Sequence, residues 1–197
     1  MYFGTGSNAC VYDGNIITQS IVSLGFMLGD EGSGCHIGKR IVHDYFLGIM
    51  PDDLRKKFDE KYHLDKDTLL KNVYHGDAPS RYLAEFAKFA NEYIDNQYII
   101  EVVGDCFEAF INTSFRPECN EVKRSGEILS LRNQSKAMTE KGFLDFARND
   151  KIAFVGSVAF SFQSILLQIL ENHQIKCSKI LKNPMDGLIE YYKNSIA

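Results

Sequence analysis

The chain has 197 residues, of which 45% are hydrophobic and 24% charged, proportions that exclude disordered and collagen-like proteins. Its 22 Lys and Arg residues against 26 Asp and Glu residues give a formal net charge of −4, which provides no cationic surface for nucleic acid or an anionic membrane. We therefore expect neither nucleic acid nor a membrane as a partner.

The sequence also predicts where the protein resides. Its longest apolar runs, residues 152–160 and 164–170, fall well short of the roughly 20 residues that a membrane span needs. The N-terminus lacks the basic and then apolar segments of a secretory signal. The cysteines occur singly, as Cys10, Cys35, Cys106, Cys119 and Cys177. Because the cysteines are unpaired and no export signal is visible, we expect a cytoplasmic protein. In such a protein each cysteine is expected to act as a small buried hydrophobic residue.

Three short strands are predicted at the start of the chain. Residues 1–6 and 9–12 are β-prone, Asp13-Gly14 is typical of a hairpin turn, and residues 16–22 contain β-branched side chains. Residues 23–34 then contain four glycines around an Asp-Glu pair. Such glycine density predicts a loop in which the main chain approaches another group closely.

Helical patterns dominate from about residue 35 to 115. Residues 35–50 place apolar side chains at helical spacing, and Pro51 is expected to end that helix. One apolar stripe predicts a single helix over 79–94, and another helix is expected over 97–114.

The last third of the chain begins with its most polar stretch, residues 116–142, which predicts a surface excursion. Residues 151–174 predict a buried strand, a glycine turn and a helix. Residues 175–181 predict another strand, before a turn and a closing helix. This order indicates an α/β fold with antiparallel strands at its start and crossover helices later.

The segment Gly4-Thr5-Gly6-Ser7-Asn8 lies between two predicted strands. Its glycines would let amide groups and hydroxyls face one anion, although an ordinary polar turn explains the same pattern. A P-loop lysine motif and a helix-opening GxGxxG are both missing from the sequence.

Two further glycine motifs are candidates for ligand binding. In the segment Gly29–Gly34, the adjacent acids Asp30 and Glu31 precede a predicted helix. Two carboxylates in such a place can bind hydroxyl groups or Mg²⁺-bound water, or act in acid–base catalysis. A helix cap with an exposed acid is the alternative. The segment Val155–Ala159 ends a predicted strand and begins a helix, which is where ligands commonly approach the sheet of an α/β protein. Close packing of the strand against the helix is the alternative explanation of its glycine. The five histidines have no metal-ligand spacing, so no metal site is expected.

The order of these motifs, GTGSN, then SLGFMLGDEGSG, then FVGSVAFSF, resembles a known family. It is similar to the N-acetylglucosamine kinase-like proteins of the BadF/BadG/BcrA/BcrD ATPase family, within the sugar kinase/Hsp70/actin superfamily. The resemblance covers nearly the whole chain except residues 116–142. It implies a ribonuclease H-like βββαβα lobe of an actin-like ATPase fold, with the helical block as an insertion.

The resemblance also implies three sets of site residues. Those matching the phosphate motif are Gly4, Thr5, Gly6 and Ser7. Those matching the sugar-binding positions are Asn8, Gly25, Asp30 and Glu31. Those matching the adenosine motif are Gly156 and Ser157. Leu24 stands where the animal kinase has tryptophan, so the surface for stacking a pyranose is smaller and the sugar is not fixed.

The activity implied is transfer of the γ-phosphoryl group of Mg-ATP to a hydroxyl of an amino sugar. In the family, the first phosphate loop and the aspartate that acts as base precede GTGS, which here begins at residue 4. Residues 1–197 therefore resemble the C-terminal lobe alone, without the N-terminal lobe and its base. We expect an apolar face near residues 1–22, which a second copy of the chain or the N-terminal lobe would cover.

Two other functions remain open at this point. The chain could be a non-catalytic module that binds a nucleotide or a sugar, or that mediates an interaction. It could also be an ATPase activator of a CoA-ester reductase or dehydratase, which needs cysteines that share an iron–sulfur cluster across a dimer. Cys106 and Cys119 do not match that arrangement.

Overall fold

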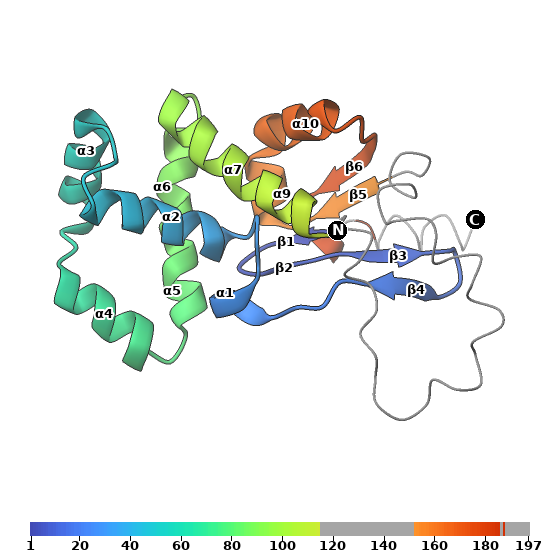
Figure 1. Ribbon diagram of the computed structural model, residues 1–197, viewed down its shortest axis with the longest axis horizontal. Coiled ribbons are helices and arrows are strands. Elements are labelled where there is room, and N and C mark those ends of the chain that lie inside the picture. Colours follow the sequence, from blue (N-terminus) through green and yellow to red (C-terminus); the bar gives the residue numbers. More distant parts are fainter. Residues whose placement is uncertain (115–151, 186, 188–197) are drawn as a thin grey trace.

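A computed structural model of the protein describes residues 1–114, 152–185 and 187, and these form a mixed α/β fold (Figure 1). The strands are β1 (Tyr2–Phe3), β2 (Ser7–Asn8), β3 (Cys10–Tyr12), β4 (Ile17–Ser20), β5 (Ile152–Val155) and β6 (Cys177–Leu181). The helices are α1 (Gly25–Leu28), α2 (Gly34–Phe46), α3 (Asp52–Tyr62), α4 (Lys66–His75), α5 (Pro79–Glu85), α6 (Ala87–Glu92), α7 (Gln97–Ser114), α9 (Ser157–Ser161) and α10 (Gln163–Asn172). The α/β class is thus confirmed. The polar segment 116–142 and the expected closing helix lie outside the described residues.

The central sheet has the strand order β2-β1-β5-β6. Strand β1 is antiparallel to β2 and parallel to β5, and β5 is parallel to β6. Strands β3 and β4 form a separate antiparallel pair, although only Ala9 lies between β2 and β3. The carbonyl of Ala9 accepts a hydrogen bond from the amide of Ile21 (3.0 Å). The expected N-terminal strands are confirmed, but the first is short because residues 4–6 form a turn.

The helices α2 to α7 gather on one side of the sheet, and the β3–β4 pair extends from the other end (Figure 1). Helix α2 packs against α5, α6 and α7 and is the centre of this block. It ends at Phe46, four residues earlier than expected, because Gly48 adopts φ +70° and Asp44 O accepts the amides of Ile49 and Met50. The expectation that Pro51 ends this helix is therefore wrong.

Two other expected elements differ from the structure. The helix expected over 79–94 is divided at Phe86 into α5 and α6. There the amides of Phe86 and Phe89 donate to carbonyls three residues back, a tighter pattern than the α-helix. The loop expected over 23–34 contains the short helix α1.

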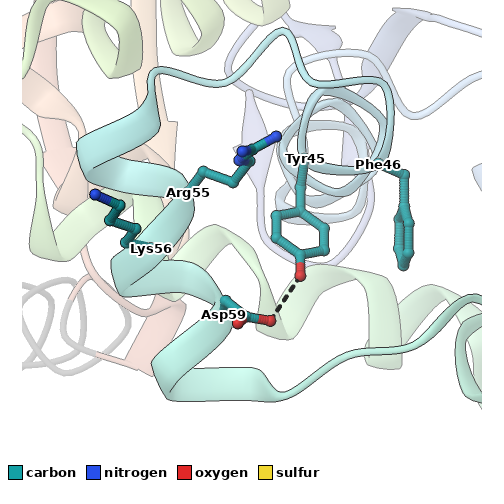
Figure 2. Close-up of a pocket in the computed structure, with 5 residues that line it drawn as sticks. All are labelled: Tyr45, Phe46, Arg55, Lys56 and Asp59. Atoms are coloured by element: carbon teal, nitrogen blue, oxygen red, sulfur yellow. Dashed lines mark hydrogen bonds between the residues drawn. The ribbon is translucent and has the colours of Figure 1, made fainter.

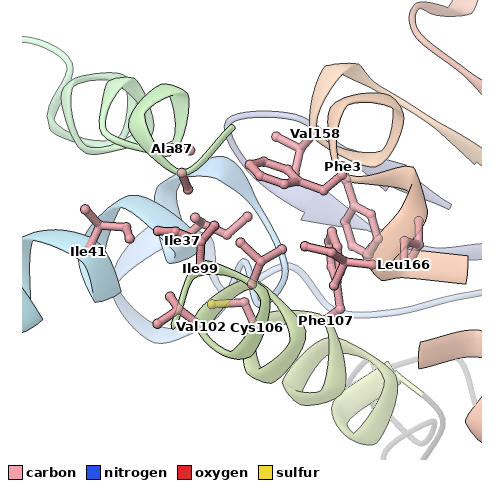
Figure 3. Packing of buried hydrophobic residues seen from close by; sticks show 14 of the residues in the cluster. Phe3, Ile37, Ile41, Ala87, Ile99, Val102, Cys106, Phe107, Val158 and Leu166 are labelled. Atoms are coloured by element: carbon pink, nitrogen blue, oxygen red, sulfur yellow. The ribbon is translucent and has the colours of Figure 1, made fainter. Parts of the chain in front are cut away.

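An aromatic cluster joins the sheet to α7. The fully buried ring of Phe3 lies between Phe107 and Phe110 of α7, with ring centroids 5.3 and 4.5 Å away, and its centroid is 5.5 Å from that of Phe154 in β5. Figure 3 shows Phe3 and Phe107 in contact within the core. Because Phe3 precedes Gly4 directly, this cluster anchors the first glycine motif to the core.

The cysteine expectation holds only in part. Cys35 and Cys106 are buried, and burial raises the pKa of their thiols to about 11 and about 12. Cys10, in contrast, is exposed, and Cys177 is half-buried. Across the residues that the structure describes, none of the helices has the length and apolar character to cross a lipid bilayer.

Two buried glycines within helices test how closely the helices pack against one another. A methyl group added at Gly38 would lie 1.8 Å from the carbonyl oxygen of Leu83, whereas one added at Gly104 would lie 3.8 Å from Ile169 Cδ1. We expect Gly38→Ala to lower the free energy of unfolding by about 3 kcal/mol, because the main chain of α5 must move. Gly104→Ala should raise it by up to about 1 kcal/mol, through helix propensity. Urea unfolding of both variants measures this, and equal effects would contradict the packing.

Candidate functional site

The first turn of α2 is hydrogen-bonded to the turn between β1 and β2. The amide of Gly34 donates to the carbonyl of Gly4 (2.8 Å), and the amide of Cys35 donates to the carbonyl of Thr5 (3.2 Å). The third amide, that of His36, donates to the hydroxyl of Ser33, the fully buried N-cap residue (3.1 Å). Protein oxygens therefore occupy the donors that open α2. The alternative of a helix cap with an exposed acid is correct for the cap, which is Ser33, but Asp30 and Glu31 are half-buried.

The turn itself retains two free donors. The amide of Gly4 donates to the carbonyl of Gly6 (2.9 Å), and that of Ser7 donates to Asp30 Oδ1 (3.3 Å). Within residues 1–114 and 152–185, nothing accepts a hydrogen bond from the amides of Thr5 and Gly6. Thr5 is also exposed. The anion-binding capacity of this motif therefore lies in the middle of the turn.

Asp30 lies directly against that turn. A methyl group added at Gly6 would be 3.0 Å from both of its carboxylate oxygens. Asp30 adopts the left-handed conformation (φ +61°), and its carbonyl accepts the amide of Ser33 (3.1 Å). The structure thus brings the Gly4–Ser7 turn and the acid of the second motif together. Glu31, its neighbour, is half-buried.

The third motif packs behind the same turn. Gly156 has φ +128°, and a methyl group added there would lie 2.0 Å from the carbonyl oxygen of Phe3. A methyl group at Gly34 would lie 3.3 Å from Val158 Cγ2. Close packing of strand and helix is therefore a real role of Gly156, whereas Ser157 is exposed.

Two of the expected sugar-binding residues stand apart from these contacts. Asn8 is exposed on β2, opposite Tyr2. Gly25 begins α1 with φ +71°, and a methyl group there would meet no atom within 4 Å. Their role in binding a sugar stays a prediction.

His36 is a supporting residue that the sequence did not reveal. Its Nδ1 accepts a hydrogen bond from the amide of Gly32 (3.1 Å), in the loop that carries Asp30. Burial, with the nearby charges of Lys39 and Arg40, lowers the pKa of His36 to about 4, so the ring is neutral at neutral pH. The only sequence signal near His36 is its position three residues after Ser33. That spacing predicts the start of a helix, but it does not predict that the imidazole ring accepts a hydrogen bond.

Comparison with known proteins supports a kinase-like fold. No protein-family model matches the chain, and no curated protein matches it. Among solved structures, it is similar to the crystal structure of a candidate N-acetylglucosamine kinase from Porphyromonas gingivalis, with 28% sequence identity and a TM-score of 0.77. The match covers 100% of this chain and 60% of the other, so the chain spans about three-fifths of that protein's length.

The neutral state of His36 predicts a pH dependence of stability. The pKa of His36 is about 4 in the folded chain against an ordinary value of 6.5, so the unfolded chain binds the proton first as pH falls. The contribution of His36 is complete above about pH 6.5 and is lost progressively toward about pH 4. We expect His36→Asn to flatten the decline in the free energy of unfolding over that range, as measured by urea unfolding at each pH.

The exposed His75 provides the matched control. His75→Asn should leave the decline unchanged. A His36→Asn variant with the same pH dependence as the parent chain would show that His36 does not titrate as a buried neutral ring.

Proposed function

We propose that the chain is a ribonuclease H-like lobe of an ATP-dependent amino-sugar kinase-like protein. Its reaction is transfer of the γ-phosphoryl group from Mg-ATP to a sugar hydroxyl. The match to a candidate N-acetylglucosamine kinase supports this function. Further support comes from the parallel pairing of β1, β5 and β6 with antiparallel β2 at the edge, which suits such a lobe. Membership of the BadF/BadG/BcrA/BcrD family is part of the same proposal.

The observation that carries the proposal is the juxtaposition of Asp30 with the amides of Thr5 and Gly6, which have no acceptor among the described residues. Amide groups bind phosphate oxygens, and a carboxylate accepts hydrogen bonds from sugar hydroxyls. In this arrangement Asp30 orients the hydroxyl while the turn binds the phosphate chain. The acceptor hydroxyl then lies beside the phosphoryl group, which is the positioning that phosphoryl transfer requires.

Mg²⁺ would enter with the nucleotide, because it is normally bound by phosphate oxygens, water and one or two carboxylates. Asp30 is a carboxylate of the suitable kind, with one oxygen engaged by the amide of Ser7. The ion would neutralise charge on the transferring phosphoryl group. Asp30 acts here as a binder, and the base that takes the hydroxyl proton belongs to a second lobe.

The remaining site residues are assigned on the resemblance. Gly156 and Ser157 bind the adenosine, and Asn8, Gly25 and Glu31 complete the sugar pocket. Leu24, which is 59% exposed, offers only an aliphatic surface to the sugar ring. A second lobe, from further chain, another protein or a second copy, supplies the base and the other phosphate loop.

A binding module is the second candidate function. It is favoured by the small number of donors near the Gly4–Ser7 turn, because the first amides of α2 and the amides of Gly4 and Ser7 all donate to protein oxygens. In that role the site would hold a nucleotide or a sugar without transferring phosphate.

Calorimetric titration with Mg-ATP, with and without N-acetylglucosamine, tests the proposal. We expect Mg-ATP to bind, and the sugar to increase its affinity through Asp30. Asp30→Asn should remove the effect of the sugar and retain nucleotide binding, because it removes one carboxylate charge at nearly constant shape. Asp77→Asn, at an exposed position between α4 and α5, is the control and should behave as the parent chain.

The outcomes separate the two functions. Nucleotide binding that the sugar never affects would support the binding module and contradict the kinase site. If neither ligand produces heat, both candidate functions are wrong for this chain.

A further inference from the structure

A hollow lies at the opposite end of α2 from the glycine motifs. It has a volume of about 390 Å³ and lies between the end of α2 and α3 (Figure 2). Its lining residues are Tyr45, Phe46, Arg55, Lys56 and Asp59. The 13 residues of α2 separate it from the glycine motifs by about 20 Å, at 1.5 Å per residue. We propose that this hollow binds a small aromatic anion, a single ring that carries a phosphate or carboxylate group.

The aromatic wall of the hollow is fixed in place. The hydroxyl of Tyr45 donates to Asp59 Oδ1 (2.9 Å), a bond that Figure 2 draws between α2 and α3. The Tyr45 ring also packs against the fully buried ring of Phe58, with centroids 4.6 Å apart. Phe46 meets Tyr45 edge to face at 5.0 Å and is 38% exposed. These contacts preorganise an aromatic surface on which a ligand ring can pack without ordering it first.

The cationic wall comes from Arg55 of α3, whose side chain points toward Tyr45, whereas that of Lys56 points away from the aromatic side chains (Figure 2). Arg55 Nη2 lies 3.4 Å from Asp52 Oδ1, and the two side chains are 49% and 83% exposed, so the pair is weak and can exchange for a ligand. Lys56 forms no ion pair with any residue that the structure describes. The guanidinium of Arg55 is therefore the group that favours an anion in this hollow.

The ligand class follows from the size and chemistry of the hollow. A volume of about 390 Å³ lies near the lower limit for small-molecule sites, which suits one ring and one charged group. A guanidinium binds a phosphate or carboxylate with paired N–H donors. The ring then packs against Phe46, while Asp59 remains available to a donor on the ring. This site is independent of the proposed function at Asp30.

Phenyl phosphate is the test ligand, with inorganic phosphate and phenol as its two halves. Each is titrated into the intact chain, and binding is followed by NMR amide shifts. We expect phenyl phosphate to shift amides of residues 45–59, and to bind more tightly than either half alone. The amides of residues 4–7, in the first glycine motif, should respond much less. A single isotherm confined to residues 4–7 would overturn the proposal.

Two variants separate the two walls. Arg55→Gln should weaken phenyl phosphate and inorganic phosphate alike by about tenfold, the loss expected for a charge-assisted contact. Phe46→Ala should weaken phenyl phosphate by about threefold and leave inorganic phosphate unchanged, because it removes only ring packing. Arg81→Gln, at an exposed position on α5, is the matched control and should have no effect.

Other results would contradict the proposal. If phosphate and phenyl phosphate bind equally, the aromatic wall contributes nothing and the hollow is only a cationic surface. If Arg81→Gln weakens binding as much as Arg55→Gln, the anion responds to overall charge and not to this hollow. Absence of any shift at residues 45–59 overturns the proposal directly.

Discussion

The contact between the β1–β2 turn and the first turn of α2 is the constraint on which the candidate site depends. The carbonyls of Gly4 and Thr5 accept the amides of Gly34 and Cys35, so main-chain hydrogen bonds join this turn of the sheet directly to the start of α2. These two hydrogen bonds satisfy amides at the start of a helix. In the part of the chain that the structure describes, the amides of Thr5 and Gly6 have no acceptor and are donors for a ligand.

Glycine favours this packing because a side chain would crowd the main chain around the turn. At Gly34 a methyl group would lie 3.2 Å from the carbonyl oxygen of Gly4, and at Gly156 one would overlap the carbonyl of Phe3. Phe3, fixed among aromatic rings, holds the turn from the core side. The glycine motifs therefore serve first as packing positions around one turn, and any ligand site is built on that packing.

Much of the fold was predictable from local sequence. Strands at the N-terminus, helices from about residue 35, and the strand–turn–helix unit around Gly156 all follow from periodicity and turn residues. The breaks within these elements were not. Helix α2 ends at Phe46 because the main-chain carbonyl of Asp44 accepts hydrogen bonds from two later amides. The apolar stripe of residues 79–94 looks continuous in the sequence, but the helix is divided at Phe86. Such changes in hydrogen bonding depend on tertiary packing, and the helical periodicity of apolar residues in the sequence does not report them.

The sequence by itself determined which residue types the site has: a glycine-rich turn, the acid Asp30, and a second glycine at a strand end. Only the tertiary structure decided how they are used. It placed Asp30 against Gly6, gave the helix cap to Ser33, and made His36 a neutral acceptor. The physical reason is that residue types fix local conformation, whereas hydrogen-bond partners and burial depend on segments that are distant in the chain and meet only when it folds.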